Sequence, residues 1–375
     1  MKIAYVVHDF HRHAGHSRYV VELAERFKTN HEVHVYANSW EEDYEGIFFH
    51  KVPAWTWKEI TKVLTFIFPA TWMIPKNFDI IHAQGLCGLR HDVNTVHIIQ
   101  KAWLRELQKR DPESIGWANL AWKSLVVPLE KFALGPTCSK RIISISKKVS
   151  NELSNEYKIK ENIDLIYHGT DTEDFNPSNK EKYRDVVRKT HQIPNEVLLG
   201  IFVGNLKKGA ATAIRSILPT KNFHLMLVSG SENAKEKKIV QELGLEKRVH
   251  WVKHSNNIQR YYAAADCMVF PTFFDTFGMV ITEAMASGLP VITNRNAGAS
   301  DLINQGVSGF LTDDPWDIDG ISKYLKLIED NPDVLNPMGR KAREAVVPFT
   351  WDKCAAETME CYRRVLMDKS STSSP

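Results

Sequence analysis

Short apolar runs rich in β-branched residues alternate with amphipathic stretches along most of this chain. In the first half, stretches with helical apolar spacing, such as residues 17–28 and 147–157, lie between the strand-like runs. The strand-like runs of this half are 3–7, 33–36, 79–83, 93–98, 142–146 and 163–167. Such alternation favours parallel sheets that are covered by helices on both faces.

The same pattern starts again in the second half. Its strand-like runs are 197–203, 223–228, 249–252, 267–270, 290–293 and 309–311. Two series of this kind predict an α/β protein with two doubly wound domains, with ligands at the carboxyl ends of the strands. A proline and polar residues interrupt a helical pattern at 190–196, so we expect one domain over 1–190 and a second over 191–350. Residues 351–375 are expected to form a final helix followed by a disordered tail from Lys369.

The composition is that of an ordinary globular chain of two domains. The 375 residues are 43% hydrophobic and 25% charged, and the net charge is +3. This charge makes no case for nucleic-acid binding, although residues 51–150 hold fifteen Lys and Arg against seven Asp and Glu. The five cysteines are scattered, which indicates reduced, buried thiols in a cytosolic protein.

No secretory or membrane-spanning segment is predicted. The first apolar run ends at His8, and the longest apolar stretch, residues 63–75, has thirteen residues and two prolines. A stretch of that length is too short to cross a bilayer. We therefore expect a cytoplasmic protein, located at the inner face of the membrane if it binds one.

Asp275 and Glu283 form the most informative pattern of the chain. A buried strand, 267–270, leads into a loop with Asp275, and a helix that opens near Phe277 and Gly278 carries Glu283. Eight helical residues rise by about 12 Å, which suits a nucleotide-sugar, and the helix N-terminus between the acids favours a diphosphate. The alternative is an amphipathic helix with a solvated acid at each end.

This segment resembles the acid–seven residues–Glu motif of retaining glycosyltransferases of the GT-B fold and family 4 type. The resemblance implies two Rossmann-like domains that face each other across a cleft, with the last helix crossing back to the first domain. It also implies that Glu283 holds the donor ribose and that Asp275, which replaces the more usual Glu, lies beside the transferred sugar. Phe277, Gly278 and Met279 would bind the donor at the helix start.

Two further loops resemble the same family. The loop after the first strand contains Ala14-Gly15 where the family has Gly-Gly, so Gly15 is expected to lie close to the donor. Four histidines in this loop leave a metal site as an alternative. In the loop after the first strand of the second domain, Lys208 matches a lysine that grips the diphosphate, and Asn205 stands where the family has Arg.

His97 follows a predicted strand and matches a histidine that the family places near the donor sugar and the acceptor; a structural role is the alternative. Residues 294–303 resemble the Asn-Gly-Ala-x-Glu-Leu-Ile segment of glycosyltransferases of lipopolysaccharide core. These glucosyltransferases are the group that the chain resembles most. Asp317-Ile318-Asp319 lies at a helix start and is expected to be structural, so we expect no essential metal.

The region that carries the acceptor in this family is rich in tryptophan and basic residues. Its tryptophans are Trp55, Trp57, Trp72, Trp103, Trp117 and Trp122. Its basic residues include Lys58, Lys62, Lys76, Arg90, Lys101, Arg105, Lys109 and Arg110. Such interleaving suits an anionic, lipid-linked acceptor at a membrane surface. The alternative is that the tryptophans belong to the core and the lysines to solvated faces.

The expected function is retaining transfer of a sugar from a nucleotide-diphosphate sugar to a glycan or lipid-linked acceptor, in synthesis of lipopolysaccharide or another cell-surface glycan. We expect no cofactor; the donor is a substrate, with a UDP-sugar as the expected one. The expected partners are the nucleotide-sugar, the acceptor and an anionic membrane, with no nucleic acid. Two alternatives stay open: a catalytically weak subunit that binds nucleotide-sugars, and a GT-B epimerase that needs no acceptor.

Overall fold

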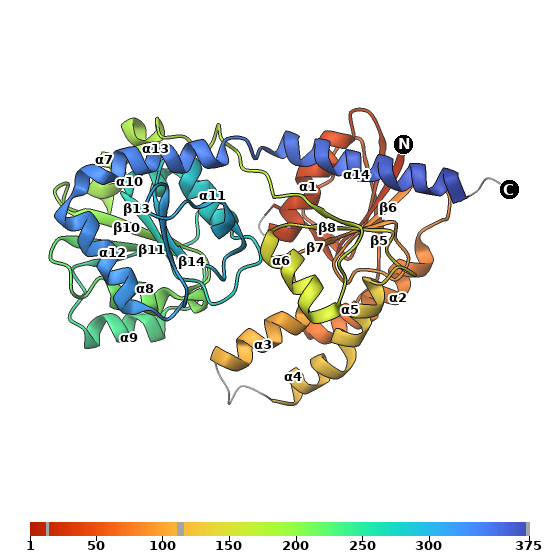
Figure 1. The fold of residues 1–375 in the computed structure, drawn as a ribbon, viewed down its shortest axis with the longest axis horizontal. Helices are drawn as coiled ribbons and strands as arrows, with labels where there is room; N and C mark the ends of the chain where they lie inside the picture. Colours follow the sequence, from red (N-terminus) through yellow and green to blue (C-terminus); the bar gives the residue numbers. More distant parts are fainter. Residues whose placement is uncertain (13–14, 111–115, 373–375) are drawn as a thin grey trace. The chain divides into compact units, whose positions relative to one another are not determined.

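The computed structural model describes residues 1–12, 15–110 and 116–372, and it divides into two compact units. The N-terminal unit comprises Met1–Gly169 together with the final helix, and the C-terminal unit comprises Thr170–Thr350 (Figure 1). Each unit is built on a sheet whose paired strands are all parallel. The expected α/β class with two doubly wound domains is therefore confirmed.

The N-terminal sheet has seven strands in the order β5-β3-β1-β6-β7-β8-β9. Their bounds are Lys2–Val6 (β1), Glu32–Ala37 (β3), Ile47–Lys51 (β5), Ile80–Gln84 (β6), Val93–Val96 (β7), Arg141–Ser144 (β8) and Ile163–Leu165 (β9). Two short strands, β2 (Asp9–Phe10) and β4 (Ser39–Trp40), pair beside it. β1 has a strand on each side, and its fully buried residues make it the centre of this core.

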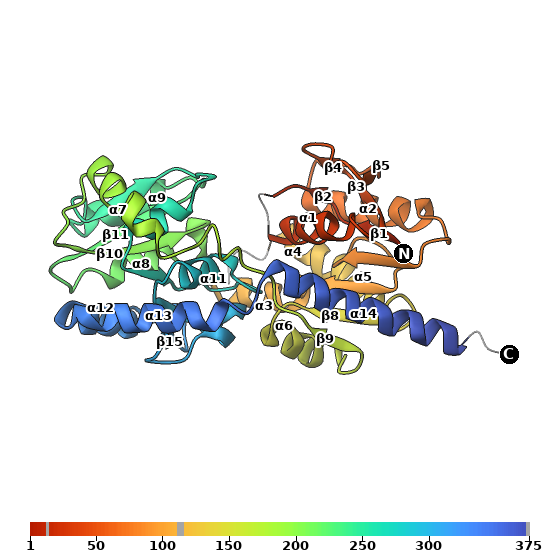
Figure 2. The same cartoon turned by 90° about the horizontal axis from the view of Figure 1, so that it is seen from above.

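Helices of the N-terminal unit follow most of these strands. They are α1 (Gly15–Phe27), α2 (Glu59–Met73), α3 (Gln100–Arg110), α4 (Trp117–Ala121), α5 (Val127–Ala133), α6 (Lys147–Glu152) and α14 (Trp351–Thr372), with π-helical turns η2 (Trp122–Val126) and η3 (Leu153–Tyr157). α14, the helix that ends the chain, packs against α1 and β8, as Figures 1 and 2 both show. The tail expected to be disordered from Lys369 is therefore helical through Thr372, and residues 373–375 lie outside the described part.

The C-terminal sheet has six strands in the order β12-β11-β10-β13-β14-β15. Its strands are Leu198–Val203 (β10), Phe223–Val228 (β11), Val249–Val252 (β12), Cys267–Phe270 (β13), Val291–Asn294 (β14) and Gly309–Thr312 (β15). Its helices are α7 (Asn179–Thr190), α8 (Ala210–Ser216), α9 (Ala234–Glu242), α10 (Gln259–Ala264), α11 (Met279–Ala286), α12 (Ile318–Asp330) and α13 (Leu335–Val346), with 3₁₀ turns η4 (Leu206–Lys208), η5 (Gly298–Leu302) and η6 (Pro332–Val334).

The two units divide after Gly169, upstream of the boundary expected at residue 190. The reason is that α7 packs on α10 of the C-terminal unit. Arg184 and Arg188 of α7 bind the two carboxylate oxygens of Asp266 at 2.7 and 2.8 Å, and Arg188 is fully buried. A buried guanidinium paired in this way fixes the helix to its unit.

Three other expectations can be compared with the fold. All five cysteines are buried and free of disulfides, as expected. Among the described residues, every helix is too short or too polar to cross a membrane. Asp317 caps α12 by accepting a hydrogen bond from the Gly320 amide at 2.8 Å, so its structural role is confirmed.

Candidate functional site

The predicted donor segment forms the strand, loop and helix that its sequence indicates. β13 is fully buried, and α11 begins at Met279, directly after Gly278. Gly278 has a φ of +90°, a left-handed conformation that residues with a Cβ atom rarely adopt. The N-terminus of α11 therefore lies between Asp275 and Glu283, as predicted.

Glu283 is buried on α11, with 7% of its surface exposed. The Tyr262 hydroxyl lies 3.3 Å from its Oε2 atom and 3.2 Å from the Val280 carbonyl oxygen. Tyr262 comes from α10 and was not among the predicted site residues, because no local pattern links it to Glu283. The Tyr262 hydroxyl therefore donates a hydrogen bond to the buried carboxylate.

Lys208 and Asp275 form an ion pair, with 2.7 Å between Nζ and Oδ2. The pairing follows from the sheet, because β10 and β13 are neighbours and each leads into one of the two loops. A Cβ atom on Gly209 would lie 1.9 Å from the Pro271 carbonyl oxygen, so only glycine permits this approach. A lysine ammonium has three N–H donors, and two are left for an anion at the start of α11.

Asn205 shapes the loop that carries Lys208. Its side chain is exposed and its Oδ1 atom accepts a hydrogen bond from the Lys207 amide at 2.9 Å, which caps η4. Its carbonyl oxygen accepts a hydrogen bond from the Lys208 amide at 2.9 Å. The position where the family has Arg is thus occupied by a capping residue.

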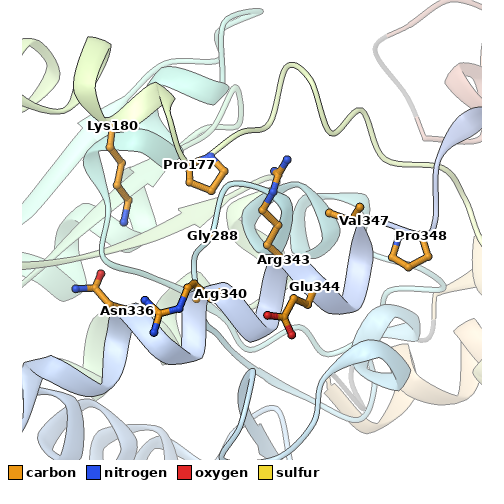
Figure 3. Close-up of a pocket in the computed structure, with 10 residues that line it drawn as sticks. Pro177, Lys180, Gly288, Asn336, Arg340, Arg343, Glu344, Val347 and Pro348 are labelled. Atoms are coloured by element: carbon orange, nitrogen blue, oxygen red, sulfur yellow. The ribbon is translucent and has the colours of Figure 1, made fainter.

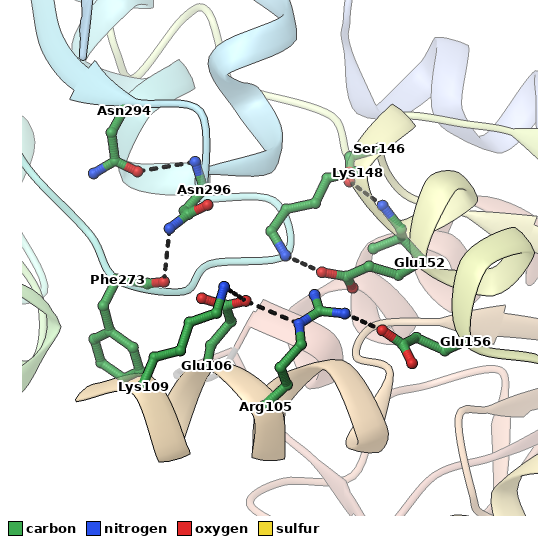
Figure 4. A network of polar contacts seen from close by, with 11 residues as sticks. Arg105, Glu106, Lys109, Ser146, Lys148, Glu152, Glu156, Phe273, Asn294 and Asn296 are labelled. Carbon is green, nitrogen blue, oxygen red and sulfur yellow. Dashed lines mark hydrogen bonds and ion pairs between the residues drawn. The ribbon is translucent and has the colours of Figure 1, made fainter. Parts of the chain in front are cut away.

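The loop after β14 is hydrogen-bonded to the loop of Asp275. The Asp275 amide donates to the Asn296 carbonyl at 3.2 Å, and the Asp275 carbonyl accepts from the Gly298 amide at 3.0 Å. Asn296 also donates from Nδ2 to the Phe273 carbonyl at 3.3 Å and from its amide to Asn294 Oδ1 at 2.9 Å (Figure 4). These bonds give residues 294–303 a structural role in holding the acidic loop.

Phe277 and Met279, two further predicted donor residues, differ in their exposure. Phe277 is 2% exposed, and its carbonyl oxygen accepts a hydrogen bond from the Ala299 amide at 2.6 Å. Met279 is partly exposed at the first position of α11. Buried Phe277 therefore anchors the loop, whereas Met279 stands at the helix end itself.

In the N-terminal unit, Gly15 is the exposed first residue of α1, and Ala14 lies outside the described residues. Ser17 closes the preceding loop by donating from Oγ to the Asp9 carbonyl at 2.6 Å and accepting from the His11 amide at 2.7 Å. This fully buried serine holds the chain that enters α1 and was not predicted as a site residue.

His97 directly follows β7, and its Nε2 atom lies 2.8 Å from Oε1 of Gln84, the last residue of β6. An amide oxygen only accepts hydrogen bonds, so Nε2 carries the proton and Nδ1 is an acceptor. Nδ1 is buried without a hydrogen-bond partner in the described part of the chain. His97 therefore presents an unused acceptor, and Gln84, which sets its tautomer, was not predicted.

Rings from several segments surround His97. Its centroid lies 6.0 Å from that of His16, 5.3 Å from that of Tyr19 and 5.5 Å from that of His168. Burial lowers the pKa of His97 well below its ordinary value and that of His168 to about 3. These imidazoles are neutral at pH 7. Across residues 1–12, 15–110 and 116–372, no group of three or more His, Cys, Asp or Glu side chains could hold a metal ion.

The structure divides the predicted tryptophans between surface and interior. Trp55, Trp57 and Trp72 are 74%, 83% and 78% exposed. Trp122 is partly buried and donates from Nε1 to Gln100 Oε1 at 3.0 Å. Trp103 is also partly buried, and the side chain of Trp117 lies outside the described residues.

The basic residues of α3 are largely paired with acids. Arg105 contacts Glu106 at 3.1 Å and also Glu156, and Lys109 contacts Glu106 at 3.0 Å (Figure 4). The excess of basic residues in this region therefore does not appear as free charge on α3. The exposed lysines Lys58, Lys76, Lys123 and Lys131 lie on or beside α2, η2 and α5 instead.

Solved structures of several glycosyltransferases have this fold. WaaG, a glycosyltransferase involved in lipopolysaccharide biosynthesis, aligns with a TM-score of 0.77 and 18% identity over 94% of this chain and 98% of its own. HepE from Anabaena, in complex with UDP and glucose, aligns with a TM-score of 0.71 and 19% identity over 96% and 98% of the two chains.

Sequence comparison gives a curated relative and two family matches. The D-inositol 3-phosphate glycosyltransferase of Corynebacterium glutamicum is 27% identical over 228 residues, 56% of this chain and 53% of the relative. The chain therefore spans about half the length of that relative. Residues 13–174 match the family described as Glycosyltransferase Family 4, and residues 184–345 match Glycosyl transferases group 1. The two matches follow the two units and together span most of the chain. The chain therefore belongs to the GT-B glycosyltransferases that combine these two domains.

Proposed function

We propose that this protein is a retaining glycosyltransferase that moves a sugar from a UDP-sugar to a glycan or lipid-linked acceptor, in synthesis of lipopolysaccharide or another cell-surface glycan. The fold shared with WaaG and with UDP-bound HepE supports the acceptor class and the nucleotide. The observation that carries the proposal is the arrangement of Glu283, the α11 N-terminus and the Lys208–Asp275 pair around one loop.

This arrangement suits a nucleoside diphosphate as leaving group. The two free N–H donors of Lys208 and the dipole of α11 would stabilise the charge that develops as the glycosidic bond breaks. Buried Glu283 would accept hydrogen bonds from the ribose hydroxyls. Asp275 would hold Lys208 through Oδ2 and meet a sugar hydroxyl through Oδ1.

His97 would act on the transferred sugar or the acceptor as a neutral imidazole. Its Nδ1 atom can accept a hydrogen bond from a hydroxyl, because Gln84 keeps the proton on Nε2. We assign no covalent nucleophile. Lysine and helix N-terminus supply the positive charge in this scheme, so the proposed reaction has no essential metal.

The donor can be identified by incubating the purified protein with UDP-, GDP-, ADP- and dTDP-sugars and detecting the released nucleoside diphosphate, with and without lipid-linked glycans. We expect release from a UDP-sugar that Glu283→Ala abolishes. Glu236→Ala is the matched control, because Glu236 is equally buried, at 6% exposure, on α9 of the same unit.

Three outcomes separate this proposal from its alternatives. Turnover that needs no acceptor and changes the donor sugar would make the protein an epimerase. UDP binding without turnover under any condition would make it a binding subunit. Turnover that survives Glu283→Ala in a folded protein would remove the donor site assigned here.

The tryptophan-rich region expected to carry the acceptor has an exposed aromatic face, which we define as Trp55, Trp57, Phe68, Trp72 and Met73. α2 buries two of its sides, in separate clusters that include Phe66 and Ile67. A remaining side carries Phe68 and Trp72, whose ring centroids lie 6.1 Å apart. Such large exposed rings add nothing to the core and are typical of interaction surfaces.

We propose that an anionic bilayer covers this face. Exposed Lys58 and Lys76 lie at the two ends of α2, and Lys123 and Lys131 lie on the adjoining η2 and α5. Glu59 is the exposed acid of α2. Tryptophan beside lysine suits the boundary between lipid headgroups and acyl chains, where each lysine contributes about 1 kcal/mol of attraction to anionic lipid.

Cosedimentation with vesicles tests this surface. We expect binding to phosphatidylcholine with phosphatidylglycerol, weak binding to phosphatidylcholine alone, and loss of binding in Trp55→Ser/Trp57→Ser/Trp72→Ser. Trp316→Ser is the control, because Trp316 is a 45% exposed tryptophan of the C-terminal unit. Equal sedimentation of both variants would reject the surface, and unchanged donor hydrolysis in the triple variant would separate this result from the donor assignment.

A further inference from the structure

A cavity of the C-terminal unit lies at the far end of α11 from the Lys208–Asp275 pair. It has a volume of about 610 Å³, and Gly288, which follows α11, lines it. Pro177, just before α7, and Lys180, in its first turn, line one side, and one face of α13 contributes Asn336 and Arg340 (Figure 3). A pocket of this volume is large enough for a small metabolite.

Two of the charged groups that line this cavity already have partners. The Arg343 guanidinium donates to the Phe175 carbonyl at 2.9 Å, to the Thr172 carbonyl at 3.3 Å and also to the Ala286 carbonyl. Glu344 pairs with Lys341 at 2.6 Å. Arg343 is therefore a structural clamp, and the carboxylate of the cavity is neutralised by a neighbour.

Lys180 and Arg340 are left as cations at one end of the cavity. Among the described residues, no carboxylate lies within ion-pair distance of either side chain. Figure 3 shows them, with the Asn336 amide, at the same end and on two different helices. Five guanidinium and three ammonium N–H groups are available there.

The surroundings of Lys180 favour an added anion. Burial lowers the pKa of Lys180, and Arg184 and Arg188 lower it further, against an opposing effect of Asp266. Asp266 is already bound by both arginines, at 2.7 and 2.8 Å. Lys180 is also the second residue of α7, so the positive end of that helix dipole lies beside it.

We propose that this cavity binds a small phosphate monoester of the sugar phosphate class, with its phosphate held by Lys180, Arg340 and Asn336. The aliphatic walls formed by Pro177, Val347 and Pro348 would contact the organic part. Binding here is independent of the proposed donor site, which lies at the opposite end of α11.

Another cavity of the same unit provides a comparison. It has a volume of about 710 Å³ and is lined by Lys323 and Lys326 on α12, but also by Asp319 and Asp330. Its two cations are thus balanced by two carboxylates, and we expect it to bind no phosphate ester.

Isothermal titration calorimetry at low ionic strength, with the donor site saturated by UDP, tests the proposal with glucose 6-phosphate, inorganic phosphate and glucose. We expect saturable binding of the ester, weaker binding of phosphate and none of glucose. Lys180→Ala/Arg340→Ala should weaken binding by about tenfold or more, because two charge-assisted contacts are lost. Lys323→Ala/Lys326→Ala should leave it unchanged.

The outcomes that overturn the proposal are distinct. Absence of saturable ester binding to the folded wild-type protein would reject the site. Equal binding by the two double variants would do the same. In a parallel titration without UDP, loss of ester binding in Lys208→Ala rather than in Lys180→Ala/Arg340→Ala would show that the ester occupies the donor site. If Lys180→Ala/Arg340→Ala melts well below the wild type, the single variants Lys180→Met and Arg340→Gln are titrated in its place. Each should then bind the ester more weakly than the wild type does.

Discussion

Both units carry their candidate groups just after the carboxyl ends of sheet strands, but different interactions position these groups. In the C-terminal unit, charges and backbone bonds position the groups: Lys208 pairs with Asp275, and the loop after β14 pairs with the acidic loop. In the N-terminal unit, His97 lies among aromatic and imidazole rings and depends on a neutral partner, Gln84.

This difference predicts different sensitivities. A site built from paired charges responds to charge removal and salt, whereas a site built from buried neutral imidazoles responds to acid. The donor half should therefore tolerate mild acid better than the half that holds His97.

The largest effect should be selective loss of stability of the N-terminal unit in acid. Burial lowers the pKa of His82 and His168 to about 3 and of His8 and His91 to about 4, against an ordinary 6.5. The unfolded chain binds protons below pH 6.5 where the folded chain does not, so stability falls as pH drops from 6.5 toward these values. Each of these histidines costs up to about 2 kcal/mol at pH 5. Buried Glu130, whose pKa is raised to about 8, acts in the opposite direction and offsets part of the summed loss.

Hydrogen exchange of the two sheets at pH 7 and pH 5, corrected for intrinsic rates, measures this loss. In the C-terminal unit, the pKa of His250 falls to about 4, and burial also lowers the pKa values of His191 and His224. We expect a smaller loss there, so that sheet is the internal reference. Equal loss of protection in both sheets would contradict the comparison.

The second prediction concerns His97. His97→Ala should lower kcat for sugar transfer by about 10²–10³, as expected for loss of a positioned imidazole, while UDP affinity changes little. His91→Ala is the control, because it also removes a buried neutral imidazole of this unit, 3.0 Å from Ser139 Oγ. A parallel fall in UDP affinity for His97→Ala would show that the imidazole serves the donor instead.

The third prediction concerns the Lys208–Asp275 pair. Lys208→Ala should weaken UDP binding by about tenfold, the value of one charge-assisted hydrogen bond, and Asp275→Ala should weaken it less. In a double-mutant cycle on unfolding, the coupling should be small, about 0.5 kcal/mol, because Lys208 is 40% exposed and solvent screens the pair. Additive losses in UDP affinity would show that Asp275 does not position Lys208.

The sequence predicted well the features that depend on a single segment of the chain. The strand bounds 223–228, 249–252 and 267–270 agree with β11, β12 and β13, because each is a short run of mostly apolar, strand-forming residues. The segment from Asp275 to Glu283 carries its own strand, loop and helix signals, so its geometry could be predicted without knowledge of the rest of the chain.

What the sequence did not show depends on distant segments. β5 (Ile47–Lys51) was missed because it is an edge strand with an exposed Phe48 and lysine at its end. Tyr262 and Gln84 contact Glu283 and His97 from other elements, and no spacing within one segment indicates such pairs. The boundary near 190 was misplaced because the pairing of α7 with Asp266 is a tertiary contact.

The tryptophan-rich region could not be assigned from sequence for the same reason. Helical spacing in α2 allows several apolar faces, and only packing shows which of them is covered. Phe66 is fully buried, whereas Trp72 on the same helix is 78% exposed. Two large aromatic residues six positions apart thus have opposite roles.

The smallest predicted effect tests this division directly. Trp72→Ser should change the free energy of unfolding by no more than about 0.5 kcal/mol, as is usual for exposed positions, because it removes little beyond the contact with Phe68. Phe66→Ala should cost about 3–5 kcal/mol through the cavity that it leaves. Urea unfolding at pH 7 measures both. A loss for Trp72→Ser near that of Phe66→Ala would mean that the ring supports the fold, and the exposed aromatic face would then need no bilayer to explain it.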